Sequence, residues 1–268
     1  MTASVSVRPP GLLEQTLRDQ VAFDREGRKY PLSSSIPPAS VARMQELIRT
    51  YKPRQTLEVG CAMGVSTLAI LEELARSTGG HHTAIDPNQS GDAPDHWHGI
   101  GAAMVSRAGL ASSFQLIEEP SYAALPELLR QGRRFDLIFI DGWHSFDFTF
   151  IDYFYADLML NDGGILIFDD AEMPQVHHVC RFLEEHKAYQ RLGPAPHGSP
   201  LSLFARLRQR LFRDTSDHSP THWGSIYAYR KLKTTTVPWG FFETNFYPGF
   251  RSYRWWMRLR GLKPQARF

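Results

Sequence analysis

Short apolar runs alternate along this chain with longer amphipathic segments, and this alternation limits the fold more than any other feature. One such run is FDLIFID (135–141), which ends in an acid. Strands that alternate with helices form a parallel, doubly wound sheet with helices on both faces, and its ligands bind at the carboxyl ends of the strands. We therefore expect an α/β fold with strands at 56–60, 82–87, 114–119, 135–141 and 165–170, and a late strand within 224–232.

The amphipathic segments predict the helices between these strands. Ser40 can cap a helix over 41–51, whose apolar residues fall on one face, and Pro53 ends it. The sequence NDGG (161–164) is expected to form a turn before the last central strand. Further helices are expected at 66–77, 99–110, 122–132 and 148–160.

The composition is that of one catalytic domain with appendages. The chain has 268 residues, 42% hydrophobic and 22% charged, which is enough for one sizeable core. The net charge of +2 does not indicate a nucleic-acid or membrane partner, and we expect no transmembrane segment or signal peptide. Cys61 and Cys180 are too few for a disulfide framework, so we expect a cytoplasmic protein.

The organisation of the sequence changes at both ends of its central region. We expect residues 1–39 to form an N-terminal segment that caps the substrate, and residues 40–232 to form the main domain. Within that domain, the turn-rich and basic stretch 194–223 is expected to be a lid-like insertion. The extension 233–268 is basic and aromatic, which leaves three roles open: a homo-oligomer contact, a contact with a lipid surface, or a disordered tail.

The stretch LEVGCAMGVS (57–66) indicates a cofactor site. Gly60 ends the first strand and Gly64 begins the next helix, so the backbone can approach a ligand and helix amides can point toward it. A tight strand-to-helix turn would need the same glycines. The dinucleotide fingerprint G-x-G-x-x-G is not met, because Ala62 and Val65 replace its second and third glycines. The pattern therefore argues against a nicotinamide cofactor.

Asp86 ends the second strand, where a carboxylate can accept both hydroxyls of a ribose or simply form an Asp-Pro turn. With it, the chain resembles the class I S-adenosylmethionine-dependent methyltransferases over residues 40–192 and again near 225–231. Glu58, Gly60 and Gly64 match the E-x-G-x-x-x-G motif of that family, and Asp86 matches its ribose-binding acid. The resemblance implies a seven-stranded Rossmann-like sheet and S-adenosylmethionine as cofactor, held by Glu58, Gly60, Cys61, Gly64, Ser66, Asp86, Glu118, Ser121 and Asp141.

Three acids end two strands that are expected to be neighbours in the sheet. Asp141 follows one strand, and Asp169 and Asp170 follow the next. Carboxylates that converge at one rim repel one another unless a cation or a proton offsets their charge. Oxygen ligands with room for water suit Mg²⁺ better than Zn²⁺. The sequence therefore predicts a magnesium site at Asp141, Asp169 and Asp170, although strand-end aspartates also cap helices or face solvent.

His144 follows Asp141 closely enough to lie over the same rim. The pattern I-D-G-x-H followed by G-G-I-x-x-x-D-D is similar to a methyltransferase subgroup that includes the metal-dependent sugar O-methyltransferases of antibiotic biosynthesis. By that resemblance Asp141, Asp169 and Asp170 hold the metal, and His144 is the catalytic base, acting beside Asp141. Catechol-type enzymes of the family usually have Asn at the position of Asp170 and a Lys base. For Trp143 we favour ordinary packing over a role as a pocket wall.

We therefore expect a methyltransferase that acts on a hydroxyl of a small molecule, such as a sugar or another natural product of secondary metabolism. The sequence IDGW (140–143) lacks the Asn/Asp-Pro-Pro-aromatic motif of amino-methyltransferases that flip a base, so no nucleic-acid substrate is expected. Two alternatives stay open: a protein that binds S-adenosylmethionine without catalysis, and a metal-independent methyltransferase. The segment YPLSSSIPP (30–38) is expected to help shape the acceptor pocket.

Overall fold

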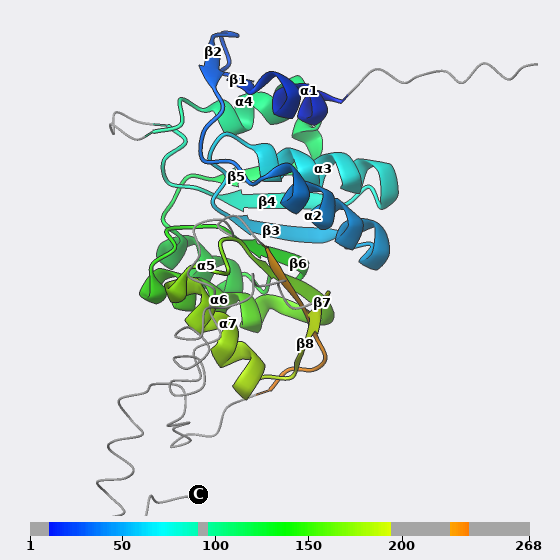
Figure 1. Ribbon diagram of the computed structural model, residues 1–268, viewed down its shortest axis with the longest axis vertical. Coiled ribbons are helices and arrows are strands. Elements are labelled where there is room, and N and C mark those ends of the chain that lie inside the picture. The colour runs from blue at the N-terminus through cyan, green and yellow to red at the C-terminus, as the bar shows by residue number, and fades with distance from the viewer. Residues whose placement is uncertain (1–10, 91–95, 194–225, 236–268) are drawn as a thin grey trace, which may run out of the picture.

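The computed structural model describes residues 11–90, 96–193 and 226–235. One large sheet runs through the molecule, with helices packed on both of its faces, and a small hairpin lies at the end that carries α4 (Figure 1). The helices are α1 (Leu12–Asp19), α2 (Pro38–Tyr51), α3 (Val65–Ser77), α4 (Ile100–Arg107), α5 (Ser121–Arg130), α6 (Phe146–Met159) and α7 (Pro174–His186), with a 3₁₀ turn at Ala111–Ser113. The strands are β1 (Val21–Phe23), β2 (Lys29–Pro31), β3 (Gln55–Val59), β4 (His81–Ile85), β5 (Phe114–Ile117), β6 (Phe135–Ile140), β7 (Leu160–Phe168), β8 (Tyr189–Leu192) and β9 (Tyr227–Lys231).

The large sheet has seven strands in the order β5-β4-β3-β6-β7-β9-β8. Strands β5, β4, β3, β6 and β7 are parallel, and β9 is antiparallel to both of its neighbours. The chain order reverses direction across the sheet between β3 and β6, which is the position where ligands bind in open α/β sheets. The expected α/β, doubly wound, mostly parallel sheet with helices on both faces is therefore confirmed.

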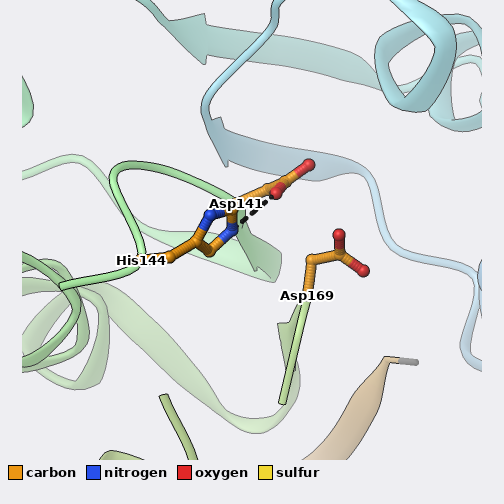
Figure 2. Close-up of side chains that lie close together, drawn as sticks. All are labelled: Asp141, His144 and Asp169. Atoms are coloured by element: carbon orange, nitrogen blue, oxygen red, sulfur yellow. Dashed lines mark hydrogen bonds and ion pairs between the residues drawn. The ribbon is translucent and has the colours of Figure 1, made fainter. Parts of the chain in front are cut away.

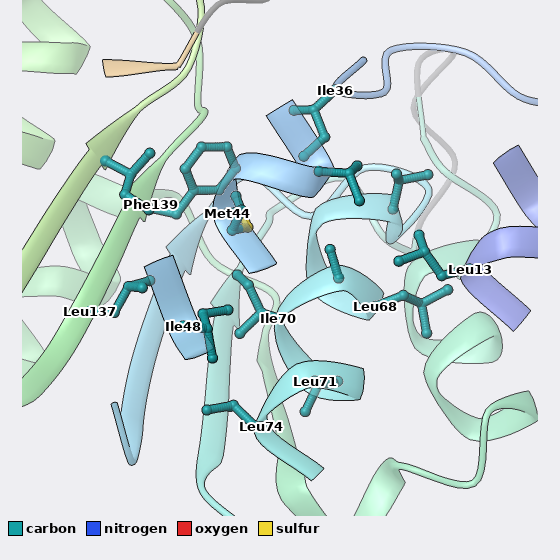
Figure 3. Close-up of a cluster of buried hydrophobic side chains, with 14 of the residues drawn as sticks. Leu13, Ile36, Met44, Ile48, Leu68, Ile70, Leu71, Leu74, Leu137 and Phe139 are labelled. Atoms are coloured by element: carbon teal, nitrogen blue, oxygen red, sulfur yellow. The ribbon is translucent and has the colours of Figure 1, made fainter. Parts of the chain in front are cut away.

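The side chains of β6 alternate between two apolar cores, as the two-residue period of a strand requires. Leu137 and Phe139 pack with α2 and α3 on one face (Figure 3), whereas Ile138 and Ile140 pack with α5, α6 and α7 on the other. All four side chains are almost fully buried. Since burial of one such side chain contributes about 2 kcal/mol, each face holds its helices mainly through this apolar contact.

Two details of the sequence prediction are wrong. Helix α2 begins at Pro38, so Ser40 lies buried inside its first turn and does not cap it. Proline is favoured at a first helical position because its missing N–H has no partner there in any helix. The NDGG sequence forms no separate turn, because β7 already begins at Leu160 and its pairing with β6 shifts register across this stretch. Gly163 permits the irregularity with a φ of +83°.

The sequence did not predict α1, the β1–β2 hairpin, α7 or β8. The hairpin strands have three residues each, too few to establish a period. The proposed lid at 194–223 and nearly all of the basic extension 233–268 lie outside the described residues, so the domain boundaries remain predictions. None of the helices in the described ranges is both long and apolar enough to cross a membrane.

Candidate active site

A cavity of about 550 Å³ opens at the carboxyl ends of the central strands. Backbone hydrogen bonds align these ends: Asp86 N–H donates to Ile117, Gly60 N–H to Ile85, Asp141 N–H to Val59 and Asp169 N–H to Ile140, all at 2.9–3.0 Å. The residues that follow β4, β3, β6 and β7 are therefore held at one rim. The predicted residues that line the cavity are Gly60, Cys61, Ser66, Asp86, Ser121, Asp141, His144 and Asp170.

Gly60 brings β3 and β6 into contact at this rim. Its φ is +94°, and a Cβ atom at this position would clash with the backbone carbonyl of Asp141. Only glycine accepts both the left-handed conformation and the close approach. Gly64 has a φ of +82° and lies directly before α3, with its backbone close to Gly101. Gly60 lines the cavity, whereas Gly64 lies outside its lining and shapes the turn that leads into α3.

Asp86 braces the turn after β3. Its Oδ2 accepts hydrogen bonds from the N–H groups of Cys61 and Ala62 at 3.1 and 2.7 Å and from Gln89 Nε2 at 3.1 Å. Its Oδ1 accepts the N–H of Asn88 at 2.8 Å. The carboxylate is 4% exposed, lines the cavity and has protein donors on both oxygens. Its predicted contact with a ribose is untested, whereas its structural role in the turn is clear.

Glu58 lies beneath the same turn rather than in the cavity lining. It is fully buried, its Oε2 accepts the hydroxyl of Thr67 at 2.5 Å, and it pairs with His82 Nε2 at 3.2 Å. His82 in turn shares a hydrogen bond of 2.8 Å with Thr56. The sequence analysis missed His82, which is one of several polar residues on a buried strand. Glu58 therefore supports the cofactor turn from below.

The second acidic group lines the cavity with Asp141, His144 and Asp170. His144 Nε2 lies 3.1 Å from Asp141 Oδ1 (Figure 2) and 3.8 Å from Asp170 Oδ2. Asp169 rises from the end of the neighbouring strand toward the same space. His144 and Asp170 both have left-handed backbones, with φ of +57° and +47°. Such strain is uncommon outside glycine and gathers at functional sites.

The pKa values of two acids reflect this crowding. Burial, followed by the charges of Glu58 and Asp170, raises the pKa of Asp141 well above its ordinary value. Burial, followed by the charges of Asp141 and Asp170, raises the pKa of Asp169 well above its ordinary value too. Among the described atoms, Asp169 Oδ1 is buried and has no hydrogen-bond partner. A cation at this position would satisfy that oxygen and relieve the repulsion.

The three residues whose ligand atoms lie close enough together to bind a metal ion differ in one member from the three that the sequence predicts. One ligand atom from each of Asp141, His144 and Asp169 lies within 4.8 Å of the other two. Asp141 and Asp169 are common to both sets, while His144 takes the place that the sequence assigned to Asp170. Carboxylate oxygens suit Mg²⁺ or Mn²⁺, and an imidazole suits softer divalent ions. The residues present therefore fit a divalent cation, and His144 lies where either a ligand or a base would lie.

Some of the other residues considered in the sequence analysis line the cavity, and others do not. Glu118 is outside the cavity lining and accepts a hydrogen bond from Ser90. Trp143 is 73% exposed and lines the cavity, so our preference for ordinary packing was wrong. Ser34, Ser35 and Ile36 of the segment 30–38 line the cavity, and a contribution of this segment to the acceptor pocket stays a prediction. The sequence analysis missed Trp97 and Phe148, because aromatic residues beside loops carry no distinguishing pattern.

Comparisons with known proteins agree with this geometry. A family model described as a methyltransferase domain matches residues 57–171. A caffeoyl-CoA O-methyltransferase from Stellaria longipes is 26% identical over 184 residues, which cover 61% of this chain and 72% of that protein. The match to the family model contains the glycine turn, Asp86 and the acidic rim.

Solved structures show the same fold. An SAH-bound methyltransferase from Podospora anserina has a TM-score of 0.58 at 17% identity and covers 84% of this chain and 89% of its own. The O-methyltransferase TomG from Streptomyces achromogenes, in complex with SAM, has a TM-score of 0.52 at 20% identity, covering 70% and 84%. These structures show the fold, and the sequence matches support the assignment of this chain to the class I S-adenosylmethionine-dependent O-methyltransferases.

Proposed function

We propose that this enzyme methylates a hydroxyl of a small molecule, such as a sugar or another natural product, with help from a divalent cation and with His144 as base. The observation that carries the proposal is the convergence of Asp141, His144 and Asp169 at the rim of the cavity that also contains Gly60 and Asp86. The relatives support this acceptor class by name, since one is a caffeoyl-CoA O-methyltransferase and another is involved in tomaymycin synthesis.

The chemical step needs little covalent help from the protein. The acceptor oxygen attacks the methyl carbon of the sulfonium in line, the carbon–sulfur bond breaks, and its electron pair stays on sulfur. The products are a methyl ether and S-adenosylhomocysteine, and the hydroxyl proton passes to Nδ1 of His144, because Nε2 donates its own hydrogen to Asp141. The enzyme contributes chiefly by holding the two reactants in this geometry and by excluding water.

The acids at the rim prepare the acceptor for this step. When bound, Mg²⁺ supplies positive charge that lowers the pKa of an acceptor hydroxyl. Asp141 and Asp169 would hold it, with Asp170 as the third ligand that the sequence predicts. Asp141 also accepts a hydrogen bond from the His144 ring and so fixes the orientation of the imidazole. Histidine is the side chain that most often acts as a general base in enzymes.

A metal-independent methyltransferase is the second candidate. The hydrogen bond of 3.1 Å between His144 and Asp141 favours it, because a carboxylate can orient a histidine base without any ion. Turnover distinguishes the two candidates. We would measure S-adenosylhomocysteine formation on a panel of phenolic and glycosidic hydroxyl compounds, with Mg²⁺ and with EDTA, for the wild type, Asp141→Ala and the exposed-acid control Asp147→Asn.

The metal-assisted proposal expects turnover that Mg²⁺ restores after EDTA in the wild type and in Asp147→Asn, and that is lost in Asp141→Ala. Methylation at the same rate in the presence of EDTA would contradict the role of the ion but not the methyltransferase activity. Tight donor binding without turnover on any acceptor would favour a non-catalytic binding protein. A cytoplasmic location, a homo-oligomer and a role in secondary metabolism remain predictions from the sequence.

A further inference from the structure

Helix α6 is apolar on its outer face as well as on its inner one. It lies between α5 and α7 on one face of the large sheet (Figure 1). Its inner face, which includes Asp152 and Tyr153, is buried against the sheet. Its outer face carries Ile151, Phe154 and Leu158, which are 38%, 51% and 42% exposed. Because residues three and four apart are neighbours on a helix, these three side chains form one continuous strip, which we call the α6 ridge.

The helices on either side of α6 have polar outer faces. Glu127 and Arg130 form an exposed ion pair on α5, and Gln175 and Glu184 are exposed on α7. Helix α6, in contrast, contains no Lys or Arg. A surface helix normally presents polar side chains outward, and a helix that is apolar all round is normally covered on both sides. The α6 ridge therefore indicates a contact surface that the described residues leave exposed.

The last described residues lie at one end of this ridge. Lys187 Nζ donates to Asp157 Oδ2 on α6 at 2.6 Å and to the backbone carbonyl of Thr235 at 3.0 Å. Asp157, which precedes Leu158, is 6% exposed and also accepts the hydroxyl of Tyr189 at 2.8 Å. A buried network thus ties Thr235 to the C-terminal end of α6, and the chain continues from there.

The sequence after Thr235 suits an apolar surface. Residues 236–268 lie outside the described residues, and their sequence includes PWGFFETNFYPGF (238–250) and RSYRWWMRLRGL (251–262). These stretches are rich in aromatic side chains, and the second is basic, whereas the exposed residue at the N-terminal end of the ridge is the acid Asp147. Helix α6 has 14 residues and is about 21 Å long, a distance that about seven extended residues span. The extension is therefore long enough to follow the whole ridge.

We propose that the C-terminal extension packs aromatic side chains along the α6 ridge of its own chain. Its attachment beside Leu158 favours its own chain over a second copy, because a tethered segment has an effective concentration in the millimolar range. A stable dimer also buries about 800 Å² on each partner, or about 20–30 residues, whereas the ridge offers three side chains. This inference goes beyond the proposed function and does not rest on it.

Photocrosslinking of the full chain tests the contact and identifies its occupant. The photoreactive amino acid p-benzoylphenylalanine, in place of Phe154, would be irradiated, and mass spectrometry would locate the crosslinked peptide. We expect crosslinks to peptides from residues 236–268, in a product that migrates at the mass of one chain. The matched control carries the same probe in place of Arg18, which is exposed on α1 at the other end of the molecule (Figure 1), and should lose this product.

Thiol labelling measures how well the ridge is covered. The chain's own cysteines, Cys61 and Cys180, are buried, so a thiol introduced at the surface can be followed separately. The thiol introduced by Phe154→Cys should react about tenfold more slowly than that introduced by Arg18→Cys, because thiol reactivity depends on exposure. The difference should not change with protein concentration. Leu158→Cys provides the same test if the change at Phe154 disturbs folding.

Two results would overturn the inference. A crosslinked product at twice the mass of the chain would show that a second copy covers the ridge. Thiols at 154 and 158 that react as fast as the control, without crosslinks to residues 236–268, would show that the ridge is open to solvent. Neither result bears on methyl transfer, so the inference and the proposed function can fail separately.

Discussion

The two acidic sides of the cavity differ in how completely the protein satisfies them. Asp86 accepts hydrogen bonds from protein donors on both oxygens, three of them from backbone amides. Asp169, at the acidic rim just outside the cavity lining, has a buried oxygen with no partner in the described part of the chain, and burial and nearby acids raise its pKa. Asp86 is thus satisfied without a ligand, whereas Asp169 is not. Groups that are left incomplete at a cost in stability are the ones expected to meet the reactants.

This contrast gives the two sides different tasks. The turn around Asp86 is held in one conformation, because removal of this carboxylate would leave the amides of Cys61, Ala62 and Asn88 without their acceptor. The rim around Asp169 is prepared for positive charge, whether that charge is a cation, a proton or the sulfonium of the donor. Mutations on the two sides should therefore separate stability from activity.

The largest expected effect is on activity at the incomplete side. Asp169→Asn removes one charge from the crowded rim, so the free energy of unfolding should stay the same or rise by about 1 kcal/mol. Turnover should fall about a thousandfold, because charge stabilisation by a bound cation is worth several kcal/mol. Denaturant unfolding measures the predicted stability, and initial rates measure the predicted loss of turnover. An Asp169→Asn variant that loses stability but keeps its rate would show that Asp169 supports the fold rather than the reaction.

The next effect is on stability at the complete side. Asp86→Ala leaves the buried amides of Cys61 and Ala62 without their acceptor. We expect the free energy of unfolding of the ligand-free protein to fall by about 4 kcal/mol, since each unsatisfied buried group costs 1–3 kcal/mol. Urea unfolding without donor measures this change. An Asp86→Ala protein as stable as the wild type would mean that the turn holds itself without the acid.

Asp152 should make the free energy of unfolding of the protein depend on pH, because burial raises its pKa to about 6. The folded state keeps the Asp152 proton up to about pH 6, whereas an ordinary aspartate, as in the unfolded chain, loses it near 3.8. The stabilisation that the folded state gains from this proton is thus fully present below pH 3.8 and is lost as the pH rises through 6. Asp152→Asn has no such proton, so its stability relative to wild type should increase by about 3 kcal/mol between pH 3.8 and pH 7. A flat difference across this range, measured by denaturant unfolding, would contradict the raised pKa.

The central fold was predictable because its inner strands β3, β4, β6 and β7 are largely buried on both faces. Runs such as FDLIFI in β6 are apolar at nearly every position, and the helices between them have regular apolar faces. The N-terminal hairpin was not predictable, because its three-residue strands are stabilised by tertiary contacts such as Arg107 over the ring of Phe23. The edge strand β8 is partly polar and gives no periodic signal.

The site was predictable where its residues end strands. Gly60, Asp86, Asp141 and Asp169 follow directly from the rule that parallel strands present their carboxyl ends at one rim. Contacts between separate helices could not be predicted, and the edge-to-face contact of Tyr122 on α5 with Phe148 on α6 is one of them. A sequence also does not specify rotamers, so it could not tell whether His144 or Asp170 would complete the group with Asp141 and Asp169.

The smallest effect is that of the cation on the ligand-free protein. An ion that binds only the folded state stabilises it by about 2.7 kcal/mol at a free concentration one hundred times its dissociation constant. Mg²⁺ should therefore raise the melting temperature of the wild type and of Asp86→Asn, whose acidic rim is intact, but not that of Asp169→Asn. Differential scanning calorimetry with Mg²⁺, with Mn²⁺ and with EDTA measures this. If the melting temperature of Asp169→Asn rises as much as that of the wild type, the ion binds elsewhere, and the unpaired Asp169 oxygen is better explained by a shared proton. In that case the incomplete side of the cavity would serve the histidine base alone.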